Sequence, residues 1–121
     1  EALEYLNDFV KHRRYSLQPT YILERKYQRL ISDYFLNKKI PMTCKALSSS
    51  CFVDPYGNVF PCSIYDKRIG NLKEYDFDIK RLWNSEMAMK VQKEIEHGNC
   101  PQCWTPCEAY QTLLGNLRSW W

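Results

Sequence analysis

The sequence predicts an α+β fold, in which N-terminal helices are followed by a small β-hairpin that packs on further helices around a cysteine-built site. Three observations support this prediction. Apolar residues recur at helical spacing over 1–40, strand formers flank a proline–glycine turn over 51–62, and all six cysteines fall between Cys44 and Cys107. We therefore expect a helical linker or extension over 1–40 and a cysteine-bearing domain over 41–121.

The first 40 residues predict two helices, because Pro19 interrupts the helical pattern. The second helix covers about residues 21–36, is strongly amphipathic, and has Thr20 as a candidate N-cap. We expect its apolar face to dock on a neighbouring domain or on the rest of this chain. That face consists of Leu23, Tyr27, Leu30, Ile31 and Tyr34.

Residues 51–62 predict a β-hairpin with a tight turn. Strand formers at 52–53 and 59–60 flank the turn Asp54-Pro-Tyr-Gly57, where proline is preset for the bend and glycine accommodates a positive φ. An isolated hairpin is only marginally stable in water, so other parts of the chain must hold this one in place.

The rest of the chain predicts two further helical segments. A connecting turn is expected at 69–72, followed by a helix over 79–97 that breaks and restarts at 84–85. Gly98 is a candidate C-cap for this helix. The last helix begins at Pro106, where proline is acceptable in the first turn.

Composition excludes several classes of protein. Hydrophobic residues make up 45% of the chain, which indicates a folded protein and not a disordered one. The net charge of +3 is mild and residues 11–14 form the only dense basic patch, so we do not expect nucleic-acid binding. No stretch has the length of a membrane span and no signal peptide is visible, so we expect a cytoplasmic protein without a membrane partner.

The cysteine pattern predicts a metal site. Thiolates two residues apart on a turn can bind one metal, and Cys100 and Cys103 form one such pair. Disulfides are the alternative, but disulfide scaffolds usually distribute cysteines over the whole chain, whereas the first 43 residues have none. Zinc sites typically have two such pairs, so the single pair favours an iron–sulfur site without excluding zinc. Neither His12 nor His97 lies at ligand spacing from the cysteines.

These motifs together resemble a known family. Its cysteine framework corresponds here to Cys44, Cys62, Cys100, Cys103 and Cys107. With the segment Asp54-Pro-Tyr-Gly-Asn-Val-Phe-Pro-Cys62, it is similar to the C-terminal auxiliary-cluster domain of radical S-adenosylmethionine enzymes, called the SPASM or shortened twitch domain. The resemblance covers about residues 41–117. The preceding helix resembles the segment that links the catalytic barrel of those enzymes to this domain.

The resemblance implies one 4Fe–4S cluster, ligated by cysteines of the hairpin-plus-helix domain. Two all-cysteine clusters would need eight cysteines, whereas this chain has six. The family's pattern places the ligands at Cys44, Cys62, Cys100 and Cys103. Cys107 is the main alternative ligand, because a helix start favours a thiolate. Cys51 is expected to be a small buried residue of the core that does not bind the cluster.

The resemblance also implies that the chain is part of a radical S-adenosylmethionine oxidoreductase or maturase, in which the cluster serves electron transfer or substrate positioning. The C-x3-C-x2-C motif that binds S-adenosylmethionine is missing, since the nearest match has Tyr110 in its third position. We therefore expect S-adenosylmethionine only in the barrel of the parent chain, and no activity from this part alone. The expected partners are that barrel and a peptide or small-molecule substrate. Glu108 is expected to be a first-turn helix residue and not a catalytic acid.

A second hypothesis is a structural zinc-binding interaction module with no redox role. It uses the same cysteines, so elemental analysis of protein isolated without oxygen separates the two hypotheses. Zinc or disulfides can replace a cluster that is lost during aerobic isolation.

Overall fold

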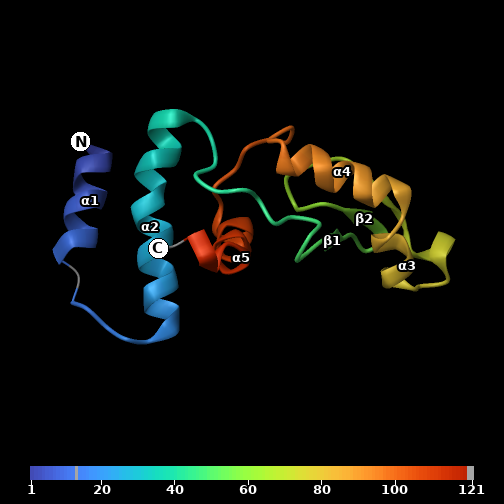
Figure 1. Ribbon diagram of the computed structural model, residues 1–121, viewed down its shortest axis with the longest axis horizontal. Coiled ribbons are helices and arrows are strands. Elements are labelled where there is room, and N and C mark those ends of the chain that lie inside the picture. The colour runs from blue at the N-terminus through green and yellow to red at the C-terminus, as the bar shows by residue number, and fades with distance from the viewer. Residues whose placement is uncertain (13, 120–121) are drawn as a thin grey trace.

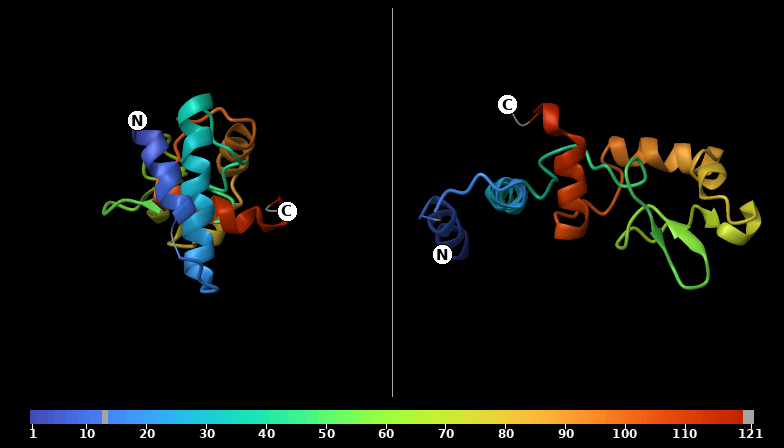
Figure 2. Two further views of the ribbon diagram at one scale, coloured as in Figure 1. Left: turned by 90° about the vertical axis from the view of Figure 1, so that its left-hand side faces the viewer. Right: turned by 90° about the horizontal axis from the view of Figure 1, so that it is seen from below.

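The computed structural model describes residues 1–12 and 14–119 and shows an elongated molecule (Figure 1). Helices α1 and α2 lie at one end, a small sheet with α3 and α4 lies at the other, and α5 lies between them (Figures 1 and 2). The elements of the described residues are α1 (Ala2–His12), α2 (Pro19–Asn37), β1 (Phe52–Val53), β2 (Asn58–Phe60), β3 (Gly70–Asn71), the 3-10 helix η1 (Leu72–Tyr75), α3 (Ile79–Trp83), α4 (Glu86–Glu96), α5 (Pro106–Gly115) and the 3-10 helix η2 (Leu117–Ser119). This confirms the expected α+β class.

The two N-terminal helices form as predicted, but α2 begins differently. Its N-cap is Gln18, which makes no capping hydrogen bond through its side chain, so the prediction of Thr20 as the cap is wrong. Pro19 occupies the first turn of the helix. A backbone N–H at this position would have no intrahelical acceptor, so the absence of an N–H in proline costs no hydrogen bond. The two helices pack on each other, and Ser32 Oγ donates a hydrogen bond to Asn7 Oδ1 at 2.9 Å.

The predicted apolar face of α2 packs against α5 and the loop that precedes it. The buried residues of this first core are Trp104, Ala109 and Leu113. All five predicted side chains of the α2 face pack on them, and the ring of Tyr27 stacks on Trp104 with 6.1 Å between ring centroids. Helix α2 therefore lies between α1 on one side and α5 on the other (Figure 2).

A second core lies beneath the sheet, whose strand order is β1-β2-β3 and whose pairs are antiparallel. Its fully buried side chains include Val59, Leu82 and Val91. The hairpin is confirmed, with Phe52 opposite Phe60, but the connecting turn expected at 69–72 is wrong. This segment forms β3 and the start of η1, because its backbone pairs with the outer edge of the hairpin and the side chain of Asn71 caps η1.

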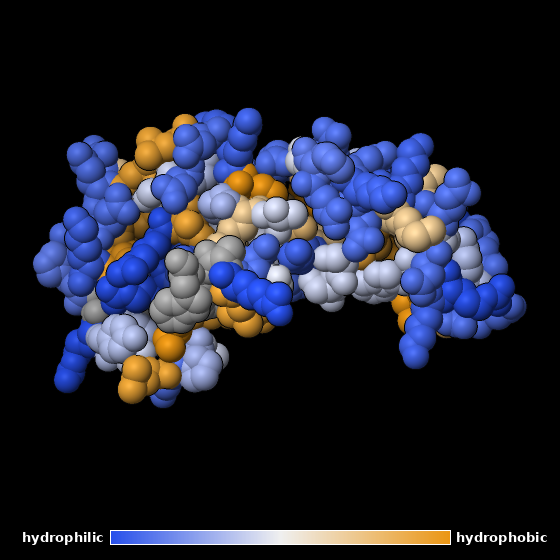
Figure 3. Space-filling model, viewed as in Figure 1, coloured by the Kyte–Doolittle hydropathy of each residue, from blue (hydrophilic) through white to orange (hydrophobic). Residues whose placement is uncertain are grey.

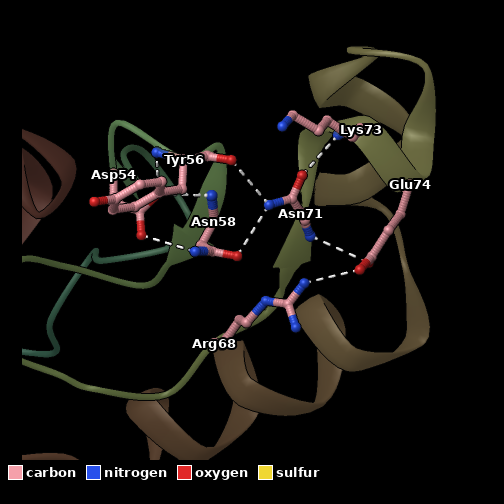
Figure 4. Close-up of polar contacts among 7 residues, drawn as sticks. All are labelled: Asp54, Tyr56, Asn58, Arg68, Asn71, Lys73 and Glu74. Atoms are coloured by element: carbon pink, nitrogen blue, oxygen red, sulfur yellow. Dashed lines mark hydrogen bonds and ion pairs between the residues drawn. The ribbon is translucent and has the colours of Figure 1, made fainter.

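The hairpin turn is held by polar contacts from β3, which Figure 4 shows. The backbone N–H groups of Tyr56 and Asn58 donate to Asp54 Oδ1 at 2.8 and 2.9 Å, and Gly57 has a φ of +87° as the turn prediction requires. From β3, Asn71 Nδ2 donates to the Tyr56 carbonyl oxygen at 3.1 Å and to Asn58 Oδ1 at 3.0 Å. The support that an isolated hairpin lacks thus comes from its third strand.

The predicted helix break is also confirmed. Helix α3 ends before Ser85, whose Oγ accepts a hydrogen bond from the Ala88 N–H at 3.2 Å and caps α4. At the other end of α4 the C-cap is His97, and Gly98 follows with a φ of +79°. This turn redirects the chain toward the remaining cysteines.

Apolar side chains are unevenly distributed over the surface. In the view of Figure 3 they gather more over the end formed by α1, α2 and α5 than over the end that carries α3 and α4. Exposed examples at this end are Leu17, Leu36, Leu114 and Leu117. Among the described residues, no helix is both long enough and apolar enough to cross a membrane.

Candidate metal centre

Four cysteines from three distant segments line one cavity, which we call the thiol cavity. These are Cys44, Cys62, Cys100 and Cys103. The segments that carry them meet between α4 and α5 (Figures 1 and 2). The rest of the lining is mostly apolar, with Ile40, Ile64 and Ile95 among its members, so a group in the cavity would be shielded from water on several sides.

Local structure explains how each thiol reaches the cavity. Cys44 follows the segment that leaves α2, and Cys62 follows β2 directly after the buried Pro61. Cys100 and Cys103 lie on the turn after α4. Within this turn Gln102 has a φ of +56°, a left-handed conformation that residues with a side chain seldom adopt.

Each thiol of the cavity receives a hydrogen-bond donor from a residue two or three positions later in the chain. Such donors stabilise negative charge on sulfur and are the kind of contact that tunes thiolate ligands. The pairs are Ala46 N to Cys44 Sγ at 3.4 Å, Tyr65 N to Cys62 Sγ at 3.3 Å, Gln102 Nε2 to Cys100 Sγ at 3.6 Å, and Thr105 Oγ1 to Cys103 Sγ at 4.0 Å.

Burial raises the pKa of the Cys44 thiol and of the Cys62 thiol above the ordinary cysteine value, and the local hydrogen bonds offset part of this rise. Nearby acidic groups add to it. Cys100 contributes to the raised pKa of Cys44, and Cys103 contributes to that of Cys62. Because ionising these thiols together in an apolar cavity is unfavourable, the arrangement favours a cationic group that compensates their charge.

Glu108 is a further acidic group that lines the cavity, and its place there was not predicted from the sequence. Its side chain is only 7% exposed, and among the described residues its Oε2 atom has no hydrogen-bond partner. Burial raises the pKa of this carboxyl, which in turn contributes to the raised pKa of Cys44 and Cys62. Glu108 does lie in the first turn of α5, as expected, but on the buried face that also carries Thr112 and Leu113. That spacing is the signal that would have revealed it.

No preformed site for a single metal ion is found among the described residues. Four sulfurs that each lie about 2.3 Å from a tetrahedral zinc ion are within about 4 Å of one another. Nowhere in the described residues do three or more His, Cys, Asp or Glu side chains form such a group. The four thiols nevertheless line one cavity, which Glu108 also borders.

The structure does not bring the other two cysteines into the cavity. Cys107 is exposed in the first turn of α5, and Cys51 is half-buried beside the second core. All six cysteines are free thiols, so the disulfide alternative finds no support. The ring nitrogens of His12 and His97 contact backbone carbonyls of their own helices, away from the cavity lining.

Comparison with known proteins identifies a family. The family model SPASM, described as an iron–sulfur cluster-binding domain, matches residues 44–108, more than half of the chain. The match begins at the first cysteine and ends one residue after the last. No curated protein and no solved structure matches the chain.

Proposed function

Because this chain belongs to the SPASM family of iron–sulfur cluster-binding domains, we propose that it holds one auxiliary 4Fe–4S cluster of a radical S-adenosylmethionine oxidoreductase or maturase. The observation that carries this proposal is the thiol cavity, in which four cysteines each receive a hydrogen-bond donor. A cubane cluster takes four protein ligands, which equals the number of cysteines that line the cavity.

The residues proposed to hold the cluster are Cys44, Cys62, Cys100 and Cys103. The sequence left Cys107 as an alternative ligand. Its exposed position outside the cavity supports the set of the other four cysteines as ligands. Cys51 and Cys107 alone are too few for a second all-cysteine cluster.

A bound cluster supplies one-electron chemistry. The protein around it performs three tasks. The N–H groups of Ala46 and Tyr65 and the Gln102 amide stabilise negative charge on the ligand sulfurs. The isoleucine-rich wall limits access of water, and the Cys100–Cys103 turn orients two of the thiols. The proposed role is electron transfer or substrate positioning for the parent enzyme.

We propose that catalysis takes place in a radical S-adenosylmethionine barrel of the same parent chain. This barrel would bind S-adenosylmethionine and a peptide or small-molecule substrate. The apolar surface over α1, α2 and α5 supports a large partner at that end (Figure 3). Free thiols suit the reducing cytoplasm, where we propose that the protein works.

The proposal is tested by metal analysis of protein isolated and reconstituted without oxygen. We expect a brown protein with about four iron atoms and about four sulfides per chain, and an electron paramagnetic resonance signal after reduction. A colourless protein that takes up no iron would overturn the proposal. Stoichiometric zinc in freshly isolated anaerobic protein, with no iron, would support the zinc module instead.

A further inference from the structure

Helix α2, although far from the cysteines in sequence, makes direct contacts with the turn that carries two of them. The hydroxyl of Tyr34 donates to the carbonyl oxygen of Gln102 at 2.8 Å, and the hydroxyl of Tyr27 donates to that of Trp104 at 3.4 Å. These two carbonyl groups belong to the residues on either side of Cys103. The contact is returned, since Trp104 Nε1 donates to the carbonyl oxygen of Tyr27 at 3.4 Å.

Gln102 connects the same turn to three places at once. Its Nε2 donates to the carbonyl oxygen of Gly98 at 2.7 Å and to Cys100 Sγ at 3.6 Å. Its Oε1 accepts from the N–H of Ile40, in the segment between α2 and Cys44, at 3.2 Å. Both ends of the amide are used, so neither a carboxylate nor an apolar side chain can reproduce these contacts.

These contacts also account for the backbone of Gln102. A left-handed φ of +56° is unfavourable for a residue with a side chain and persists only where the surroundings hold it. Here Tyr34 holds the Gln102 carbonyl group, while Gly98 and Ile40 hold its side chain. Without these contacts the turn could relax, and the thiols of Cys100 and Cys103 would no longer be preorganised.

We infer that α2 is a structural part of the cluster site: Tyr34 and Gln102 are positioning residues that hold the Cys100–Cys103 turn, and cluster binding is thereby coupled to the docking of α2. The inference rests on the proposed function and deepens it. Coupling of this kind is reciprocal, so a helix that stabilises the bound cluster is itself stabilised by cluster binding.

The test compares the variants Tyr34→Phe and Gln102→Glu with the control variant Tyr5→Phe. Tyr5 lies in α1 and is 77% exposed. Each protein is reconstituted without oxygen, and the rate of iron release to a chelator is measured. We expect release to be roughly tenfold faster in the two test variants, as for other contacts that orient metal ligands. The control should match the wild type. Gln102→Glu should also change the electron paramagnetic resonance signal, because the donor to Cys100 is lost.

A second measurement uses only the wild-type chain, so it does not depend on how a variant folds. Hydrogen exchange of the α2 amides should slow when the cluster is bound. If the wild type binds iron but the test variants release it at the control's rate, or if α2 exchange is unchanged, the inference is overturned and the proposed function stands. A wild-type chain that takes up no iron would overturn both.

Discussion

Each thiol of the cavity accepts a hydrogen bond from its own donor group, and all four donors belong to residues two or three positions later in the chain. The turns that direct the sulfurs inward therefore also supply the groups that stabilise their charge. Cys51 and Cys107 differ, since neither lines the cavity. At the scale of single residues, this separates proposed ligands from other cysteines.

Replacement of Cys62 or Cys103 by alanine should therefore abolish cluster binding. We expect iron to fall from about four atoms per chain to background, because a cubane cluster needs four protein ligands. Cys51→Ala and Cys107→Ala are the matched controls and should retain the iron. Retention in Cys62→Ala, or loss in Cys107→Ala, would show that the ligand set is different.

Because the Glu108 carboxyl is buried, we expect the stability of the iron-free, reduced protein to depend on pH. Burial raises its pKa in the folded state, so its favourable contribution is complete below the ordinary glutamate pKa and is lost as pH rises through the folded-state value. Glu108→Gln should accordingly become more stable relative to the wild type as the pH rises above about 4, the ordinary glutamate pKa. Urea unfolding at several pH values measures this difference.

The control for Glu108 is Glu96→Gln, which removes an exposed carboxylate of α4. A stability difference between Glu108→Gln and the wild type that does not change with pH, or one that Glu96→Gln reproduces, would contradict the assignment of Glu108 as a buried carboxyl.

At the scale of elements, the hairpin depends on its third strand. Asn71 pairs with Asn58 in the sheet, donates two hydrogen bonds to the turn region, and caps η1 through its Oδ1, which accepts from Lys73 N at 2.9 Å (Figure 4). One side chain thus contacts two backbone groups, at Tyr56 and Lys73, and the side chain of Asn58.

Asn71→Ala should lower the free energy of unfolding by about 1–2 kcal/mol, because both the cap and the hydrogen bonds to the turn are lost. Lys73→Ala is the control: its backbone N–H keeps the cap contact, so the change should stay within about 0.5 kcal/mol. Urea unfolding of the iron-free protein measures both values. Equal losses in the two variants would show that the Asn71 side chain does not hold the hairpin.

Several sequence patterns with local signals were reliable, although the expected cap at Thr20 was wrong. The turn at Asp54–Gly57 and the cap at Ser85 are confirmed, because proline, glycine and serine act on the backbone of their immediate neighbours. Strand β3 was missed, since Gly70 and Asn71 have low strand propensity. They form a strand because the edge of the hairpin offers backbone partners, which only the fold brings together.

At the scale of the whole molecule, the thiol cavity lies between two cores. One core joins α2 to α5, and the other joins the sheet to α3 and α4. Cys44 and Cys100 pack against the second core, whereas Ile40 packs against the first and also lines the cavity. A group bound in the cavity would therefore bridge the two cores, which is the physical basis of the proposed coupling between the cluster and α2.

The sequence by itself determined the α+β class, most of the helices and the hairpin turn, while its resemblance to the SPASM family implied which cysteines would hold a cluster. The helices and the turn follow from helical periodicity and from turn residues, which are local properties of the chain. Only the tertiary structure decided that Cys107 lies outside the cavity, that Glu108 borders it, and that α2 holds the Cys100–Cys103 turn. The physical reason is that these features depend on contacts between segments far apart in sequence, such as Tyr34 and Gln102, which packing of the two cores brings together.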